Sequence, residues 1–117
     1  MKATHGVTLA GENQAEALRQ LGWHVADVQA ATPAAFVDAV GVALGFPAYY
    51  GKNLDALADC LSDRTRPTAV VWNGWQFAAV ADPRRWARLL AVLEDAGSHT
   101  PPFTVLLLSE RSVPDAP

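Results

Sequence analysis

Apolar residues recur along the chain with two spacings, one typical of helices and the other of strands. Helical spacing begins after Pro33 and continues to Gly45, and it returns after Pro83. Thr32 and Asp82, which precede the two prolines, are favourable N-cap residues. With weaker signals elsewhere, the pattern predicts helices over residues 13–21, 33–44, 53–61 and 83–97. Three segments alternate or are continuously apolar, and we expect strands at residues 23–28, 68–72 and 103–108.

The order of these elements predicts the fold class. Strands that alternate with helices along a chain are typical of a parallel sheet. The segment 103–108 is apolar apart from Thr104, as expected for a parallel strand that is buried on both faces. We therefore predict an α/β domain with a small three-stranded parallel sheet packed with helices.

Composition and charge exclude several classes of protein. The chain has 117 residues, half of them hydrophobic, and a net charge of −3, which lacks the basic footprint of most nucleic-acid-binding proteins. No apolar stretch approaches the ~18 residues that a membrane-spanning helix needs. A single cysteine, Cys60, excludes an intramolecular disulfide and a cysteine-cluster metal site. The N-terminus lacks the apolar region of a signal peptide, so we expect a cytoplasmic protein. We also expect that it binds no membrane, no nucleic acid and no cofactor.

The predicted helix over residues 53–61 is acidic on one face. Asp55, Asp59 and Asp63 follow at intervals of four residues, opposite the leucines of the same helix. Asp55 is favourable near a helix N-terminus, whereas Asp59 and Asp63 repel each other at a cost of about 0.2–0.5 kcal/mol. A stripe that opposes helix preference indicates a positively charged partner, and a simple solvated face is the alternative.

Two tyrosines precede this helix in a tight turn. Both rings of Tyr49 and Tyr50 could fill the core, but adjacent turn residues rarely point the same way. We therefore expect one ring inside and one exposed beside the carboxylates, where it would anchor a protein partner.

Signals for catalysis are weak. The three histidines are scattered, and no phosphate-binding glycine loop or paired-histidine metal motif is present. Cys60 follows Asp59, whose charge would raise the thiol pKa, so we expect a buried, inert cysteine. Of the four tryptophans, Trp75 is the one that we consider for a surface role, because it follows Gly74 at the end of a strand.

Residues 46–61, with the sequence FPAYYGKNLDALADCL, resemble the signature of the barstar family, intracellular inhibitors of a secreted bacterial ribonuclease. The order of predicted elements from Trp23 to Ser109 fits the same family. The resemblance implies a barstar-like fold and a binding face on the second helix, with Asp59 in the phosphate site of the enzyme. Asp95 looks like a further acidic contact, although the alignment could instead place Glu94 there. The implied partner-binding residues are Tyr49, Gly51, Asn53, Asp55, Ala58, Asp59, Ser62, Asp63 and Asp95.

Departures from the family pattern bear on the identity of the partner. Ala58 and Arg64 stand where the best-known member has tryptophans, and Arg64 with Arg66 makes the following loop basic. Residues 1–22 have no counterpart in short family members. We expect them to form an N-terminal extension with a short helix, packed on a barstar-like domain at 23–112, with a frayed tail at 113–117.

The resemblance implies a bacterial toxin-immunity protein rather than an enzyme. The expected function is stoichiometric inhibition of a barnase-like, guanyl-preferring ribonuclease in a 1:1 complex, by a protein that is monomeric when free. Two alternatives stay open. One is a barstar-like regulator or immunity protein with a non-ribonuclease target, and the other is a small α/β enzyme or small-molecule binder that uses Tyr49, Asp55 and Asp59.

Overall fold

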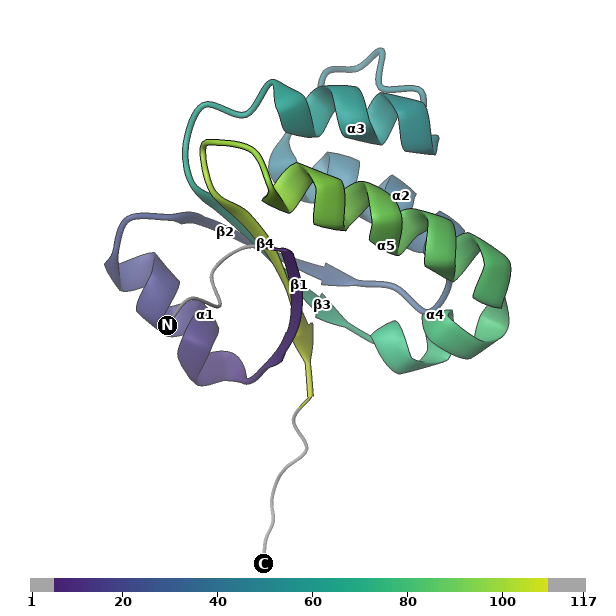
Figure 1. Cartoon of the computed structure of the whole chain (residues 1–117), viewed down its shortest axis with the longest axis horizontal. Helices are drawn as coiled ribbons and strands as arrows, with labels where there is room; N and C mark the ends of the chain where they lie inside the picture. Colours follow the sequence, from purple (N-terminus) through teal and green to yellow (C-terminus); the bar gives the residue numbers. More distant parts are fainter. Residues whose placement is uncertain (1–5, 110–117) are drawn as a thin grey trace, which may run out of the picture.

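A parallel sheet of four strands forms the centre of the molecule in the computed structural model, which describes residues 6–109. The spatial order is β1-β4-β3-β2, and every neighbouring pair is parallel (Figure 1). The strands are β1 (Gly6–Ala10), β2 (His24–Gln29), β3 (Thr68–Asn73) and β4 (Phe103–Leu108). The α/β class is therefore confirmed, but the expected number of three strands is wrong.

Within residues 6–109, five helices accompany this sheet, and its two faces do not carry the same number of them. They are α1 (Glu12–Gln20), α2 (Pro33–Leu44), α3 (Leu54–Ser62), α4 (Trp75–Ala81) and α5 (Pro83–Gly97). The larger core unites α2, α3 and α5 with one face of the sheet, around the fully buried Phe36, Trp72 and Phe103. A smaller core lies on the opposite face, where Ala15 and Leu18 of α1 pack against β3 and β4. Figure 1 shows α1 apart from the other helices, across the sheet from them.

The additional strand, β1, comes from the segment predicted as an extension. Gly6 pairs with Thr104 of β4, and the buried Thr104 hydroxyl donates a hydrogen bond of 2.9 Å to the Gly6 carbonyl. β1 is a short strand at the edge of the sheet, and its Leu9 is 60% exposed. Its sequence therefore does not contain the long apolar run that marks β3 and β4. The hydrophobic pattern therefore did not predict it.

Local capping signals placed three helices accurately. The side chains of Thr32, Asn53 and Asp82 accept hydrogen bonds from the first turns of α2, α3 and α5, which confirms their predicted roles. The first helix instead begins after Gly11 rather than at Asn13, and the Gln14 side chain accepts the Gly11 amide hydrogen bond at 2.9 Å.

Helix α4 was not predicted, and it changes the role expected for Trp75. The half-buried Trp75 indole donates a hydrogen bond of 2.9 Å to the Leu108 carbonyl and stacks on Trp86 at 6.2 Å between ring centroids. Trp75 thus packs α4 against α5 and the end of β4 and is not a surface anchor. Within residues 6–109, no helix is long and apolar enough to cross a membrane.

Candidate functional site

Helix α3 presents its carboxylates to solvent because its leucines face the core. Asn53 accepts a hydrogen bond of 2.8 Å from the Ala56 amide and so fixes the first turn. Leu57 and Leu61 are fully or almost fully buried. The opposite face carries three exposed carboxylates, from Asp55, Asp59 and the C-cap residue Asp63.

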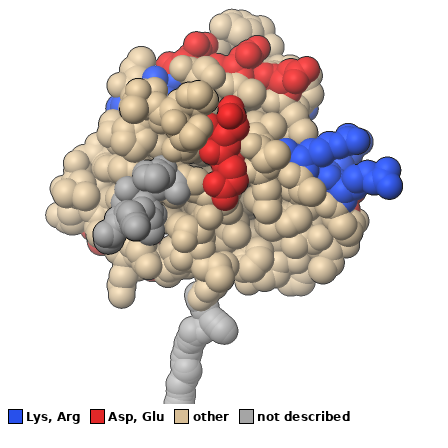
Figure 2. All heavy atoms as spheres, in the orientation of Figure 1, with Lys and Arg blue, Asp and Glu red and all other residues tan. Residues whose placement is uncertain are grey.

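A second group of carboxylates lies at the end of α5. Asp95 is exposed, with a side chain 77% accessible, and approaches His99 at 3.6 Å. Its neighbour Glu94 turns toward β1 and accepts a hydrogen bond of 3.2 Å from the Val7 amide. Figure 2 shows the acidic side chains over α3 and below it on the same face, with basic side chains at one edge. We call the exposed set Asp55, Asp59, Asp63 and Asp95 the acidic face.

The two tyrosines before α3 point in different directions, which confirms the expected arrangement. Tyr49 is 84% exposed, whereas Tyr50 is only 9% exposed and its hydroxyl donates a hydrogen bond of 2.9 Å to the Val37 carbonyl. The Tyr50 ring packs edge-on against Phe46 and occupies the space beside Gly41, where a Cβ would lie 2.6 Å from the ring. Burial, more than the nearby Cys60 and Asp38, raises the pKa of Tyr50 to about 12.

The turn between Tyr50 and α3 bends at Lys52. Lys52 has a φ of 57°, in the left-handed region that costs a residue with a Cβ on the order of 1–2 kcal/mol. Gly51, the implied contact residue, is exposed and does not adopt a positive φ. The conformational strain therefore lies at the lysine that positions the start of α3.

Arg64, in the loop after α3, is bound into the fold rather than free in solvent. Its guanidinium stacks over the Phe103 ring at 5.4 Å, and burial lowers its pKa. It donates to four backbone carbonyls, at Leu61 (2.7 Å), Ala96 (2.9 Å), His99 (2.9 Å) and Pro101 (2.7 Å). Arg64 thus adds positive charge to the loop, as expected, but its guanidinium is directed to internal carbonyls and joins the end of α3 to the end of α5.

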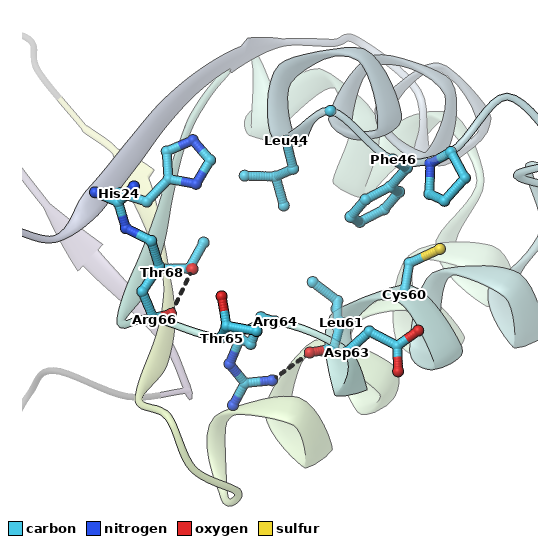
Figure 3. Close-up of a pocket in the computed structure, with 12 residues that line it drawn as sticks. His24, Leu44, Phe46, Cys60, Leu61, Asp63, Arg64, Thr65, Arg66 and Thr68 are labelled. Carbon is cyan, nitrogen blue, oxygen red and sulfur yellow. Dashed lines mark hydrogen bonds between the residues drawn. The ribbon is translucent and has the colours of Figure 1, made fainter.

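A cavity of about 260 Å³ lies beside the C-terminal half of α3. Figure 3 shows Cys60 and His24 on opposite sides of this cavity. Cys60 is half-buried rather than fully buried, and burial raises its thiol pKa, followed by the charges of Asp63 and Asp59. Within residues 6–109, no histidine nitrogen lies within 4.0 Å of an Asp59 oxygen, and no cluster suited to a metal ion is found. The described residues thus offer neither an activated thiol nor an Asp–His pair at α3.

Comparison with protein families decides the relationship. The family model described as Barstar (barnase inhibitor) matches residues 23–108, which include β2, β3, β4 and all of α2 to α5. The chain belongs to the barstar family. Barstar proteins are inhibitors rather than enzymes, and membership implies a ribonuclease partner. No curated protein matches the chain significantly.

The barstar match places the acidic face within the shared domain, whereas β1 and α1 precede the matched residues. Acidic side chains lie over α3 and below it on one face of the molecule (Figure 2), and of the two neighbours on α5, Glu94 accepts a hydrogen bond from β1 whereas Asp95 approaches His99. Sequence patterns did not indicate the four carbonyl bonds of Arg64, because three of the acceptors lie more than 30 residues away along the chain.

Proposed function

We propose that this barstar-family protein is a stoichiometric inhibitor of a secreted, barnase-like, guanyl-preferring bacterial ribonuclease, and that α3 plugs the active site of the enzyme. The observation that supports this most directly is the exposure of the carboxylates of Asp55, Asp59 and the C-cap residue Asp63, while Leu57 and Leu61 on the opposite face of α3 are buried. We further propose that the protein is cytoplasmic, is monomeric when free, and gives immunity to the toxin.

Asp59 is the residue proposed to occupy the phosphate-binding site of the ribonuclease. It lies midway along α3, between Asp55 and Asp63, and α3 itself contains no lysine or arginine that could pair with it. A carboxylate can imitate a substrate phosphate, because both accept charge-assisted hydrogen bonds from arginine and lysine. Removing it would leave the cationic groups of the enzyme buried and unpaired.

The other proposed contacts surround Asp59. The exposed Tyr49 ring is suited to anchor the rim, because tyrosine buries a large area and keeps a polar end. Asp95 extends the acidic surface from α3 to α5, and we favour it over the likewise exposed Glu94 because Glu94 already accepts a hydrogen bond from the Val7 amide of β1. The remaining contacts lie before and along α3, at Gly51, Asn53, Ala58 and Ser62.

A barstar-like regulator of a protein other than a ribonuclease is the second candidate. It is favoured by the two departures at Ala58 and Arg64, since Arg64 is committed to internal carbonyls and cannot replace an aromatic contact. Titration calorimetry against a panel of barnase-like ribonucleases distinguishes the two. Binding at 1:1 with loss of ribonuclease activity is the expected result, and failure to bind any panel member would favour the second candidate.

Four aspartate variants test how α3 acts. We expect Asp59→Ala to weaken binding by about 2–5 kcal/mol, mainly through faster dissociation. Asp55→Ala should follow, and Asp63→Ala should have a modest effect. Asp38→Ala is the matched control, because it removes the same charge from an exposed position on α2. Equal losses across the four variants would show a general field instead of an active-site plug.

A further inference from the structure

A second cavity, of about 320 Å³, lies where α2, α3 and α5 begin, at the other end of α3 from Asp63. Three cationic side chains line it, Lys52 before α3 and Arg85 and Arg88 in α5, together with one carboxylate from Asp38. Its volume is at the lower end of the ~300–1,000 Å³ that is typical of small-molecule sites. Figure 2 shows a group of basic side chains at one edge of the molecule.

Internal ion pairs leave most of this positive charge unused. Arg85 approaches Asp82 at 3.6 Å, but within residues 6–109 neither Lys52 nor Arg88 has a carboxylate within 4.0 Å. Asp38 lines the cavity without pairing with any of the three. The net charge of the lining is therefore positive, in a protein whose overall charge is −3.

The backbone brings Lys52 to this cavity at a conformational cost. Its φ of 57° is rare for a lysine, and it is the only positive φ of a non-glycine residue within residues 6–109. The first turns of three helices also border the cavity and add positive potential. The three cationic side chains nevertheless carry most of the charge, because each helix end amounts to only about half an elementary charge.

The lining combines cationic side chains, which suit a phosphate group, with apolar side chains, which suit the organic part of a small phosphate ester. Arginine presents a planar fork that matches phosphate oxygens, and lysine adds a point charge. Val37, Leu54 and Leu89 supply an apolar wall beside these charges. We propose that this cavity binds a phosphate monoester of a small organic molecule, with the phosphate at Lys52, Arg85 and Arg88. This proposal does not rest on the inhibitor function, because ligand binding to the cavity can be measured on the protein alone, without a ribonuclease.

Adenosine 5′-monophosphate is a suitable probe, with adenosine and inorganic phosphate as its two halves. Binding is followed by NMR shifts of the full chain at constant ionic strength. We expect saturable shifts at Leu54 and Leu89 with the nucleotide, weaker binding of inorganic phosphate, and none of adenosine. Absence of saturable shifts, or equal binding of adenosine, would overturn the proposal. Inorganic phosphate binding as tightly as the nucleotide would overturn its organic part.

Matched variants separate a defined site from a diffuse field. Arg88→Ala should weaken nucleotide binding about tenfold, as expected for loss of one charge-assisted hydrogen bond. Arg84→Ala removes the same charge one turn away on α5, outside the lining, and should leave the affinity nearly unchanged. Asp38→Asn should strengthen binding about two- to fivefold, since it removes the only lining carboxylate. Thermal unfolding checks that each variant is folded, and equal weakening by Arg84→Ala and Arg88→Ala would overturn the site.

Discussion

Arg64 is the single residue that does most to fix the geometry of the acidic face. Its guanidinium bonds the last turn of α3, through Leu61, to the last turn of α5, through Ala96. It therefore connects the chain segments that carry Asp63 and Asp95, although it bonds to neither carboxylate. If α3 and α5 bind the partner as proposed, we expect Arg64 to affect binding through the position of these helices rather than by direct contact.

Replacing Arg64 should therefore lower stability strongly. In Arg64→Met the apolar stem is kept, but the carbonyls lose their charged donor, and we expect a loss of about 2–3 kcal/mol in the free energy of unfolding. Urea denaturation measures it. Arg66→Met is the control, because it removes the same charge from an exposed position of the same loop and should change stability by less than about 0.5 kcal/mol. Similar losses in both variants would contradict the structural role of Arg64.

Tyr50 predicts a loss of stability at alkaline pH. Its folded pKa is raised to about 12, above the value of about 10 for an unfolded tyrosine. Stability is therefore complete below pH ~10 and falls as the pH rises toward 12, because the unfolded state loses its proton first. Thermal midpoints between pH 8 and 12 measure the decline.

The variant Tyr50→Phe tests whether this tyrosine causes the decline. It lacks the hydrogen bond to Val37 and should be about 1 kcal/mol less stable at neutral pH, with a shallower alkaline decline. Tyr49→Phe changes the exposed neighbour and should keep its neutral-pH stability. An unchanged alkaline decline in Tyr50→Phe would assign the effect to another group.

Sequence patterns predict individual residues well where the signal is local. Thr32, Asn53 and Asp82 each cap a helix that begins at the next residue. Their roles can therefore be predicted from the adjacent sequence alone. That one of Tyr49 and Tyr50 points inward and the other outward follows from the turn, whereas the resemblance to the barstar family implied that Tyr49 is the exposed one. By contrast, the partners of Arg64 and Glu94 lie on other elements, and only the folded chain shows them.

Among the elements, α5 and β1 approach so closely that a glycine is required between them. A Cβ at Gly97, the last residue of α5, would overlap the Gly6 backbone and lie 3.2 Å from the Phe103 carbonyl oxygen. Because the obstacles are backbone atoms, they cannot move aside without displacing a strand. The contact joins residues before the barstar match to the last helix within it.

We expect Gly97→Ala to destabilise the protein by about 1–3 kcal/mol, although alanine normally favours a helix. Hydrogen exchange should be accelerated in β1 more than in β3, since the strand nearest the new methyl group is displaced. Gly11→Ala is the control, because its nearest contact would be an ordinary 3.7 Å to Gln14. A Gly97→Ala protein with unchanged β1 exchange would contradict this packing.

The predictability of each element depended on the strength of its hydrophobic pattern. β3 and β4 are mainly apolar and were placed within one residue, whereas β1 has only five residues and the short α4 exposes Phe77 and Val80. An amphipathic pattern identifies an element whose apolar residues form a continuous stripe that faces the core. Neither β1 nor α4 has such a stripe. The proposed boundary between an extension at 1–22 and a domain at 23–112 remains a prediction.

At the scale of the whole molecule, charge is divided between two ends. The acidic face covers α3 and the end of α5, while Arg84, Arg85 and Arg88 lie at the start of α5 (Figure 2). The spacing of Asp55, Asp59 and Asp63 predicted the acidic part of this division. It did not predict the loss of Arg64 from the basic group, because that depends on tertiary contacts.

This polarity predicts that ribonuclease association depends on salt. The association rate should fall about tenfold or more from low to high ionic strength, as the Debye length shortens below about 10 Å. Stopped-flow measurements test this. The dissociation rate should change much less, and an association rate that is constant across salt concentrations would contradict an acidic binding face.

The position of β4 in the sheet also has a consequence for the timing of folding. β4 is last along the chain but lies between β1 and β3 in space, so β1 has no strand partner until residues 103–108 leave the ribosome. Helix α5, which precedes β4, likewise cannot bury Leu89 and Leu93 against a complete core before then. During synthesis, the earlier elements thus wait for the last strand. We therefore expect the acidic face to reach its final arrangement only after β4 has been translated, so a chain that still lacks β4 would present the α3 carboxylates without the support of the complete core.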